Sequence, residues 1–101
     1  MKKYKLFFTP AATAHIIQIS AWYNEQKKGL GKRFKDSLKT ELAEVKRNPF
    51  TRSFRYDGVR FAAVKKFPYA VHYTINEDTP IIIIHAVFGF KEDPDKWVKE
   101  I

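Results

Sequence analysis

The sequence predicts an α+β fold of the order β-α-α-β-β-β-β, in which an N-terminal helical hairpin packs on one face of a mostly antiparallel sheet. Three observations predict it. Apolar residues recur at helical spacing through residues 10–48, strand-like patterns follow through residues 53–88, and Asp57-Gly58 supplies a tight turn between two of the strands. The 101 residues, 45% of them hydrophobic, are expected to form one domain spanning residues 1–101.

A strand followed by a helix is expected at the start of the chain. Residues 3–8 are rich in aromatic side chains and end at Thr9-Pro10. Threonine can cap a helix and proline suits its first turn. The helix is therefore expected from Pro10 to about Lys28. Its inner face is expected to be formed by Ala12, Ile16, Ile19 and Tyr23.

A second helix is expected from about Leu30 to Asn48. Gly29 and Gly31 interrupt the first helical pattern, and Pro49 lies just beyond the end of the second. Two helices joined by so short a turn should run antiparallel. The inner stripe of the second helix is expected to be Phe34, Leu38, Leu42 and Val45.

Four strands are expected in the second half. Asp57-Gly58 suits a two-residue hairpin turn, and Phe67-Pro68 marks the next break. The last strand is apolar on both faces, which is typical of a strand inside a covered sheet. The four strands are expected at residues 53–56, 59–66, 69–75 and 81–88.

The net charge of +8 is unevenly distributed. Residues 1–52 hold 12 Lys and Arg against 4 Asp and Glu, whereas residues 53–101 hold 7 of each. Such a field attracts nucleic acid, acidic protein segments or anionic lipid. A row of lysines on the second helix is either a docking surface or a solubilising outer face, and it comprises Lys28, Lys32, Lys35, Lys39 and Lys46.

Several classes of protein are disfavoured. The chain has no cysteine, and its three histidines, His15, His72 and His85, lack the spacing of a zinc site, so no metal and no cofactor are expected. No phosphate-binding loop, dinucleotide fingerprint or serine nucleophile elbow is present. No apolar stretch approaches the length of a membrane span, and a cytoplasmic protein without membrane contact is expected.

A second basic cluster is expected in the sheet. It could hold a phosphodiester, with His72 as a general acid or base, as metal-free RNA cleavage requires. The alternative is a half-exposed sheet face with scattered charges. The candidate catalytic residues are Arg60, Lys65, Tyr69 and His72. His85, in the most apolar segment, is expected to be a hydrogen-bonded core histidine.

Three stretches of the chain resemble the RelE/ParE-like toxins of type II toxin-antitoxin systems. Residues 22–34, with Trp22-Tyr23 and Gly29-Leu30-Gly31, are similar to that family's helical hairpin. Residues 59–73, with Arg60 and Phe67-Pro68-Tyr69, look like its central strand pair. Residues 84–97, which end in Asp93-Pro94-Asp95-Lys96-Trp97, resemble its last strand and tail.

The tail departs from the family pattern. Many members carry a histidine after the last strand and an arginine before Asp-Pro, and here these positions are Gly89 and Glu92. Lys91 supplies part of the charge, but Glu92 would repel a phosphate. The departure counts against RelE-type cleavage of mRNA, and a degenerate, non-toxic member that binds only an antitoxin is a further alternative.

The resemblance implies a toxin that is neutralised by a cognate antitoxin protein, and operator DNA would be bound only through that antitoxin. The expected antitoxin-binding residues are Trp22, Tyr23, Lys28, Lys32, Lys35 and Lys39. Family members act on DNA gyrase (ParE-like) or cleave mRNA on the ribosome (RelE-like). The long hairpin with its Gly-Leu-Gly turn favours the ParE-like, non-enzymatic branch. In that branch the target-binding residues are expected to be Lys91, Lys96 and Trp97.

Overall fold

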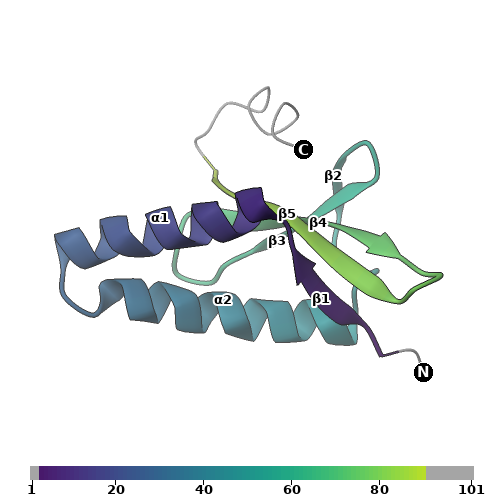
Figure 1. Ribbon diagram of the computed structural model, residues 1–101, viewed down its shortest axis with the longest axis horizontal. Helices are drawn as coiled ribbons and strands as arrows, with labels where there is room; N and C mark the ends of the chain where they lie inside the picture. Colours follow the sequence, from purple (N-terminus) through teal and green to yellow (C-terminus); the bar gives the residue numbers. More distant parts are fainter. Residues whose placement is uncertain (1–2, 91–101) are drawn as a thin grey trace.

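A helical hairpin packs on one face of a five-stranded sheet in the computed structural model, which describes residues 3–90 (Figure 1). The element order is β-α-α-β-β-β-β, and the strand order in the sheet is β1-β5-β4-β3-β2. The predicted fold class is therefore confirmed. Within the described residues, no helix is long and apolar enough to cross a membrane.

The two helices begin and end close to the predicted residues. Helix α1 spans Pro10–Gln26, and the Thr9 side chain accepts a hydrogen bond from the Ala12 backbone N–H at 3.1 Å, as the capping pattern predicts. Helix α2 spans Leu30–Arg47. All four residues of its predicted inner stripe are buried, namely Phe34, Leu38, Leu42 and Val45.

Two glycines make the tight turn between the helices possible. Gly29 precedes α2 with a φ of +87°, a backbone conformation that glycine adopts at little cost. Gly31 lies in the first turn of α2, directly against α1. A Cβ atom at this position would lie 2.3 Å from the Ser20 carbonyl oxygen, so only glycine permits the observed approach of the helices.

The sheet is antiparallel except at one edge. Strands β2 (Phe54–Tyr56), β3 (Val59–Ala63), β4 (Tyr69–Asn76) and β5 (Ile81–Gly89) pair in sequence order, and β1 (Lys5–Phe8) pairs parallel with β5. The predicted hairpin turn is present, with positive φ at both Asp57 and Gly58.

Strand β3 is shorter than predicted and ends at Ala63 rather than at Lys66. After Ala63 the chain leaves the ladder for a turn, in which the Val64 N–H still bonds to the Tyr69 carbonyl at 2.9 Å. Lys66 has a φ of +71°, which is incompatible with a strand. The turn before β4 therefore begins earlier than Phe67-Pro68 suggests.

The main core lies between the helices and the sheet. It joins the stripe of α2 to Ala12 of α1 and to strand residues that include Val71, Tyr73, Ile82, Ile84 and Val87. The predicted inner-face residues of α1, Ile16, Ile19 and Tyr23, pack against the same cluster. A second, smaller cluster of Ala86 and Phe88, with Tyr56 packed against it, is separate from the main core.

Candidate functional site

The outer face of the helical hairpin is basic and solvent-exposed. Lys28, Lys32, Lys35 and Lys39 are all exposed, and we call them the basic face. Lys32 donates to Asp36 at 2.9 Å. This hydrogen bond is the main reason that the pKa of Asp36 is lowered, and attraction by neighbouring lysines adds to it. Because the contact is exposed to solvent, it adds little stability. It neutralises one of the four lysines, so the face stays positive.

The two aromatic residues expected to bind an antitoxin have different environments. The side chain of Trp22 is 51% exposed, whereas Tyr23 is half-buried. Tyr23 lies within an aromatic cluster that links the hairpin to the turn between β3 and β4. Its ring stacks on Phe34, with centroids 5.8 Å apart, and meets Phe67 and Tyr69 edge to face at 5.0 and 6.2 Å. Burial, and secondarily the neighbouring Tyr69, raise the pKa of Tyr23.

A groove runs between α2 and the β3–β4 turn, and we call it the α2 groove. Its larger hollow has a volume of about 490 Å³ and is lined by Tyr23, Leu30, Arg33, Asp36, Ser37, Lys66 and Phe67. A second hollow of about 200 Å³ shares Ser37 and Lys66 with the first and adds Thr40, Glu41 and Lys65. Of the four candidate catalytic residues, only Lys65 lines either of these hollows.

Arg60 fixes the segment between α2 and β2. Its Nη1 atom donates to the Arg52 carbonyl at 2.6 Å and to the Phe50 carbonyl at 3.1 Å. Its guanidinium also lies over the ring of Phe54, 4.0 Å from the centroid. An arginine side chain interacts through its N–H donors and through the flat face of its guanidinium, and in Arg60 both are in use. The guanidinium thus links β3 to the backbone of the segment between α2 and β2.

His72 is buried on the sheet face opposite to Tyr73. Its side chain is 1% exposed, and its Nδ1 atom lies 3.1 Å from the Tyr56 hydroxyl. Burial, with smaller contributions from Arg55 and His15, lowers the pKa of His72 to about 4. Burial also raises the pKa of Tyr56 to about 12. At neutral pH this pair is uncharged, as a buried hydrogen-bonded pair should be.

The structure does not bring the four candidate catalytic residues together. Tyr69 and His72 point to opposite faces of β4, because side chains alternate along a strand. Residues that are directly paired across two strands share a face of the sheet. Arg60 is paired with Tyr73 and Phe61 with His72, so Arg60 and His72 also lie on opposite faces. Lys65 is exposed in the turn after β3.

The other two histidines form hydrogen bonds with groups of the sheet. The Nε2 atom of His85 lies 2.8 Å from the Thr74 hydroxyl, which agrees with the predicted hydrogen-bonded role, although the side chain is only partly buried. Burial lowers the pKa of His85. No role was predicted for His15 from the sequence. Its Nδ1 atom, on α1, accepts a hydrogen bond from the Val87 N–H at 3.2 Å and so provides a partner for a backbone donor of β5.

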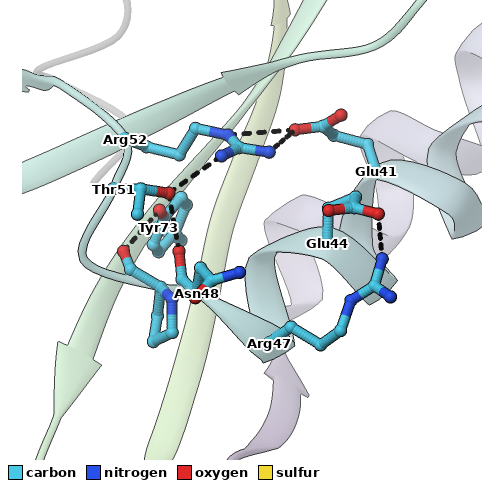
Figure 2. A network of polar contacts seen from close by, with 8 residues as sticks. Glu41, Glu44, Arg47, Asn48, Thr51, Arg52 and Tyr73 are labelled. Carbon is cyan, nitrogen blue, oxygen red and sulfur yellow. Dashed lines mark hydrogen bonds and ion pairs between the residues drawn. The ribbon is translucent and has the colours of Figure 1, made fainter.

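A polar network that joins the second half of α2 to the segment after it is not predicted by the sequence (Figure 2). Arg52 donates from Nε and Nη2 to Oε2 of Glu41, at 3.1 and 2.7 Å, and the hydroxyl of Tyr73 donates to the Pro49 carbonyl at 2.8 Å. Arg47 also pairs with Glu44. The only sequence signal was an acidic residue, Glu41, beside the apolar stripe of a helix.

The expected target-binding residues Lys91, Lys96 and Trp97, together with Glu92, lie outside the described residues. Gly89, the other position that departs from the RelE/ParE pattern, is the last residue of β5.

Comparison with known proteins agrees with this architecture. Residues 6–94 match the family described as the ParE toxin of the type II toxin-antitoxin system parDE. The fold is similar to a chain of the chromosomal ParDE toxin-antitoxin system from P. aeruginosa, with a TM-score of 0.74 and 14% identity over 86% of this chain and 96% of that chain. No curated protein matches the sequence significantly. Because the family match spans most of the sequence, the chain belongs to the ParE toxins of type II toxin-antitoxin systems.

Proposed function

We propose that this ParE-family toxin arrests growth in the cytoplasm by binding DNA gyrase, without cleaving RNA, and that a cognate antitoxin neutralises it. The observation that carries the proposal is the separation of the four candidate catalytic residues. Cleavage of RNA without a metal needs an acid, a base and a cation around one phosphate. Here Tyr69 and His72 are on opposite faces of β4, and Arg60 is engaged with backbone carbonyls.

The protonation state of His72 supports the same conclusion. A general acid or base works best when its pKa lies near the pH of the cell. The pKa of His72 is lowered to about 4, and its imidazole is 1% exposed, so substrate could not reach it without displacing its neighbours. Binding to a target protein requires no such group.

Neutralisation is proposed to begin at the basic face of the hairpin. The four lysines of that face are exposed, and Trp22 on α1 is 51% exposed. Exposed charges of one sign speed the encounter with an oppositely charged partner, and an exposed indole provides apolar contact area. An acidic antitoxin segment fits both features.

The contact with gyrase is proposed to involve Lys91, Lys96 and Trp97. This assignment rests on the sequence, in which the stretch before Trp97 is similar to the tail of the family. Tryptophan is among the residue types that contribute most to protein interfaces, and lysines guide the approach of an acidic partner surface.

The first experiment separates the two modes of toxicity. The chain would be expressed from a tightly controlled promoter in a bacterial host, and growth, plasmid supercoiling and transcript ends would be followed together. The proposal expects growth arrest with loss of gyrase-dependent supercoiling and with intact transcripts. New cuts in transcripts, with supercoiling unchanged, would establish the RelE-like alternative. No arrest by soluble protein would support a degenerate member.

A second experiment tests the tail. Trp97→Ala and the pair Lys91→Gln with Lys96→Gln are expected to weaken inhibition of purified gyrase in a supercoiling assay. Lys5→Gln on β1 is the matched control, since Lys5 is exposed and lies on a strand outside the proposed contacts. If the tail variants inhibit as strongly as the unmodified chain, the tail is not the contact.

A further inference from the structure

Arginines are concentrated in one part of the chain. Four of the five arginines lie within residues 47–60, a segment that contains no lysine and a single acidic residue, Asp57. They are Arg47, Arg52, Arg55 and Arg60. The segment also contains three aromatic residues, Phe50, Phe54 and Tyr56. Arginine binds phosphate through paired N–H donors and stacks flat on rings, whereas lysine binds as a point charge. A segment with this composition is therefore suited to binding nucleotides.

Phe54, on the edge strand β2, has an open ring face. Its side chain is 61% exposed. The guanidinium of Arg60 lies over the ring, 4.0 Å from the centroid, and no other ring among residues 3–90 contacts it. The same guanidinium is 5.6 Å from the ring centroid of Phe50, which is 47% exposed. Exposed rings beside cations are the surfaces on which unpaired bases stack.

Arg60 is held in an orientation that suits a phosphate. Both of its hydrogen bonds, to the carbonyls of Phe50 and Arg52, use Nη1. Within residues 3–90, its Nε and Nη2 atoms form no hydrogen bond and its side chain forms no ion pair. The Nε–Nη2 edge of a guanidinium can donate two parallel hydrogen bonds to phosphate oxygens. Because the carbonyls and Phe54 already fix the guanidinium, binding a phosphate would cost little further conformational freedom.

We propose that Phe54 and Arg60 form a binding site for single-stranded nucleic acid. An unpaired base stacks on the open face of Phe54, and a neighbouring phosphate accepts hydrogen bonds from the Nε–Nη2 edge of Arg60. The bases of a duplex stack on one another and are not free to reach the ring. The site shares no residue with the basic face or with the α2 groove. It goes beyond the proposed function and does not depend on it.

Oligonucleotide binding by the purified chain tests the site directly. The probes are labelled oligothymidine and oligouridine of about 16 nucleotides, and fluorescence anisotropy measures their affinity at an ionic strength of about 0.1 M. A mixed-sequence DNA duplex of about 16 base pairs is the ligand control and is expected to bind at least about fivefold more weakly. The duplex has the higher charge density, so attraction to charge alone would favour it. Preference for either single strand supports the site and identifies its ligand as DNA or RNA.

Variants of Phe54 test the stacking contact. Phe54→Leu keeps an apolar side chain but removes the ring, and it is expected to weaken binding of the single strand at least about fivefold. Phe54→Trp supplies a larger ring and should bind at least as tightly as the unmodified chain. Phe7→Leu is the matched control, since Phe7 is 56% exposed on β1 at the opposite edge of the sheet. It should change the affinity less than about twofold.

Exchange of the arginine tests the phosphate contact. Arg60→Lys keeps the charge but lacks the paired donors, so it should weaken binding about tenfold. Arg33→Lys makes the same exchange at an exposed position on α2 and should change the affinity less than about twofold. Circular dichroism at the assay temperature shows whether each variant is folded. If Arg60→Lys is partly unfolded, Phe54→Leu decides the question, because the side chain of Phe54 is largely exposed.

Three results would overturn the inference. Equal losses in Phe54→Leu and Phe7→Leu would mean that the oligonucleotide does not bind at β2. Duplex binding as tight as that of the single strand would indicate attraction to net charge alone. Displacement of the oligonucleotide by an acidic peptide of alternating glutamate and leucine, with peptide binding lost in Phe54→Leu, would make a protein segment the ligand. The assays contain neither gyrase nor an antitoxin, so their outcome is separate from that of the proposed function.

Discussion

Arg52 donates from both Nε and Nη2 to a single carboxylate oxygen of Glu41, which is 6% exposed (Figure 2). The pair links the middle of α2 to the segment that leads into β2. A carboxylate this deeply buried is unfavourable without its partner, because removing the arginine leaves a desolvated charge that has lost two hydrogen bonds.

We therefore expect Arg52→Ala to lower the free energy of unfolding by about 2 kcal/mol. Lys32→Ala is the matched control, since Lys32 and Asp36 are 79% and 55% exposed, and its cost should stay below about 0.5 kcal/mol. Urea unfolding measures both. Similar costs for the two variants would show that the Arg52–Glu41 contact adds no more than a surface pair.

The glycine pair at the helical turn gives a second prediction. In Gly31→Ala the new Cβ atom would lie 2.3 Å from a backbone oxygen, so the helices must move apart at a cost of about 2 to 3 kcal/mol. Gly29→Ala meets no atom within 4 Å, but it is strained by the φ of +87° and should cost about 1 kcal/mol. Thermal unfolding of both variants tests this order, and a more harmful Gly29→Ala would contradict it.

The third prediction concerns Arg60. Arg60→Lys keeps the charge, but an ammonium cannot both lie flat over Phe54 and reach two carbonyls. We expect a loss of about 1 to 2 kcal/mol in the free energy of unfolding. Arg33→Lys, at an exposed position on α2, is the comparison and should cost less than about 0.5 kcal/mol. Unchanged stability of Arg60→Lys would remove the structural role assigned to this arginine.

Acid sensitivity gives the fourth prediction. The pKa of His72 is near 6.5 when unfolded and about 4 when folded, so below about pH 6.5 the unfolded chain binds a proton that the folded chain does not. The contribution of His72 to stability is complete above pH 6.5. It is lost as the pH falls toward 4, by at most about 1.4 kcal/mol per pH unit.

The test compares urea unfolding of the unmodified chain and of His72→Gln between pH 7 and pH 4.5, a range set by the two pKa values. The variant should lose less stability as the pH falls. His85 and the carboxylates titrate in both proteins, so they cancel in the difference. Parallel pH profiles would mean that His72 takes up its proton in the folded state near its ordinary pKa.

The elements whose side chains follow a local period could be predicted from the sequence. The stripe of α2 repeats at helical spacing, and each of its four residues is buried as predicted. The same holds for the capping Thr9 and the turn at Asp57-Gly58, since these depend on neighbours within a few residues.

The features that sequence reasoning did not reach depend on distant partners. Gly31 is required by Ser20 on another helix, and Arg60 is occupied by carbonyls from a separate segment. The depth of His72 depends on the packing of Tyr56 and Phe88 around it, whose rings lie 5.8 and 5.2 Å from the imidazole. A residue type shows what a side chain can do, but only the packed chain shows whether it remains available.

The parallel pairing of β1 with β5 has a consequence for synthesis on the ribosome. Thr9, which directly follows β1, donates through its side chain to the carbonyl of His85, 76 residues along the chain. Closing so long a loop is slow compared with forming a local hairpin. The first strand must therefore wait, unpaired, until β5 has been translated and has left the exit tunnel. During that interval the sheet lacks one of its edge strands, so the fold of a nascent copy stays incomplete at β1 until β5 has emerged.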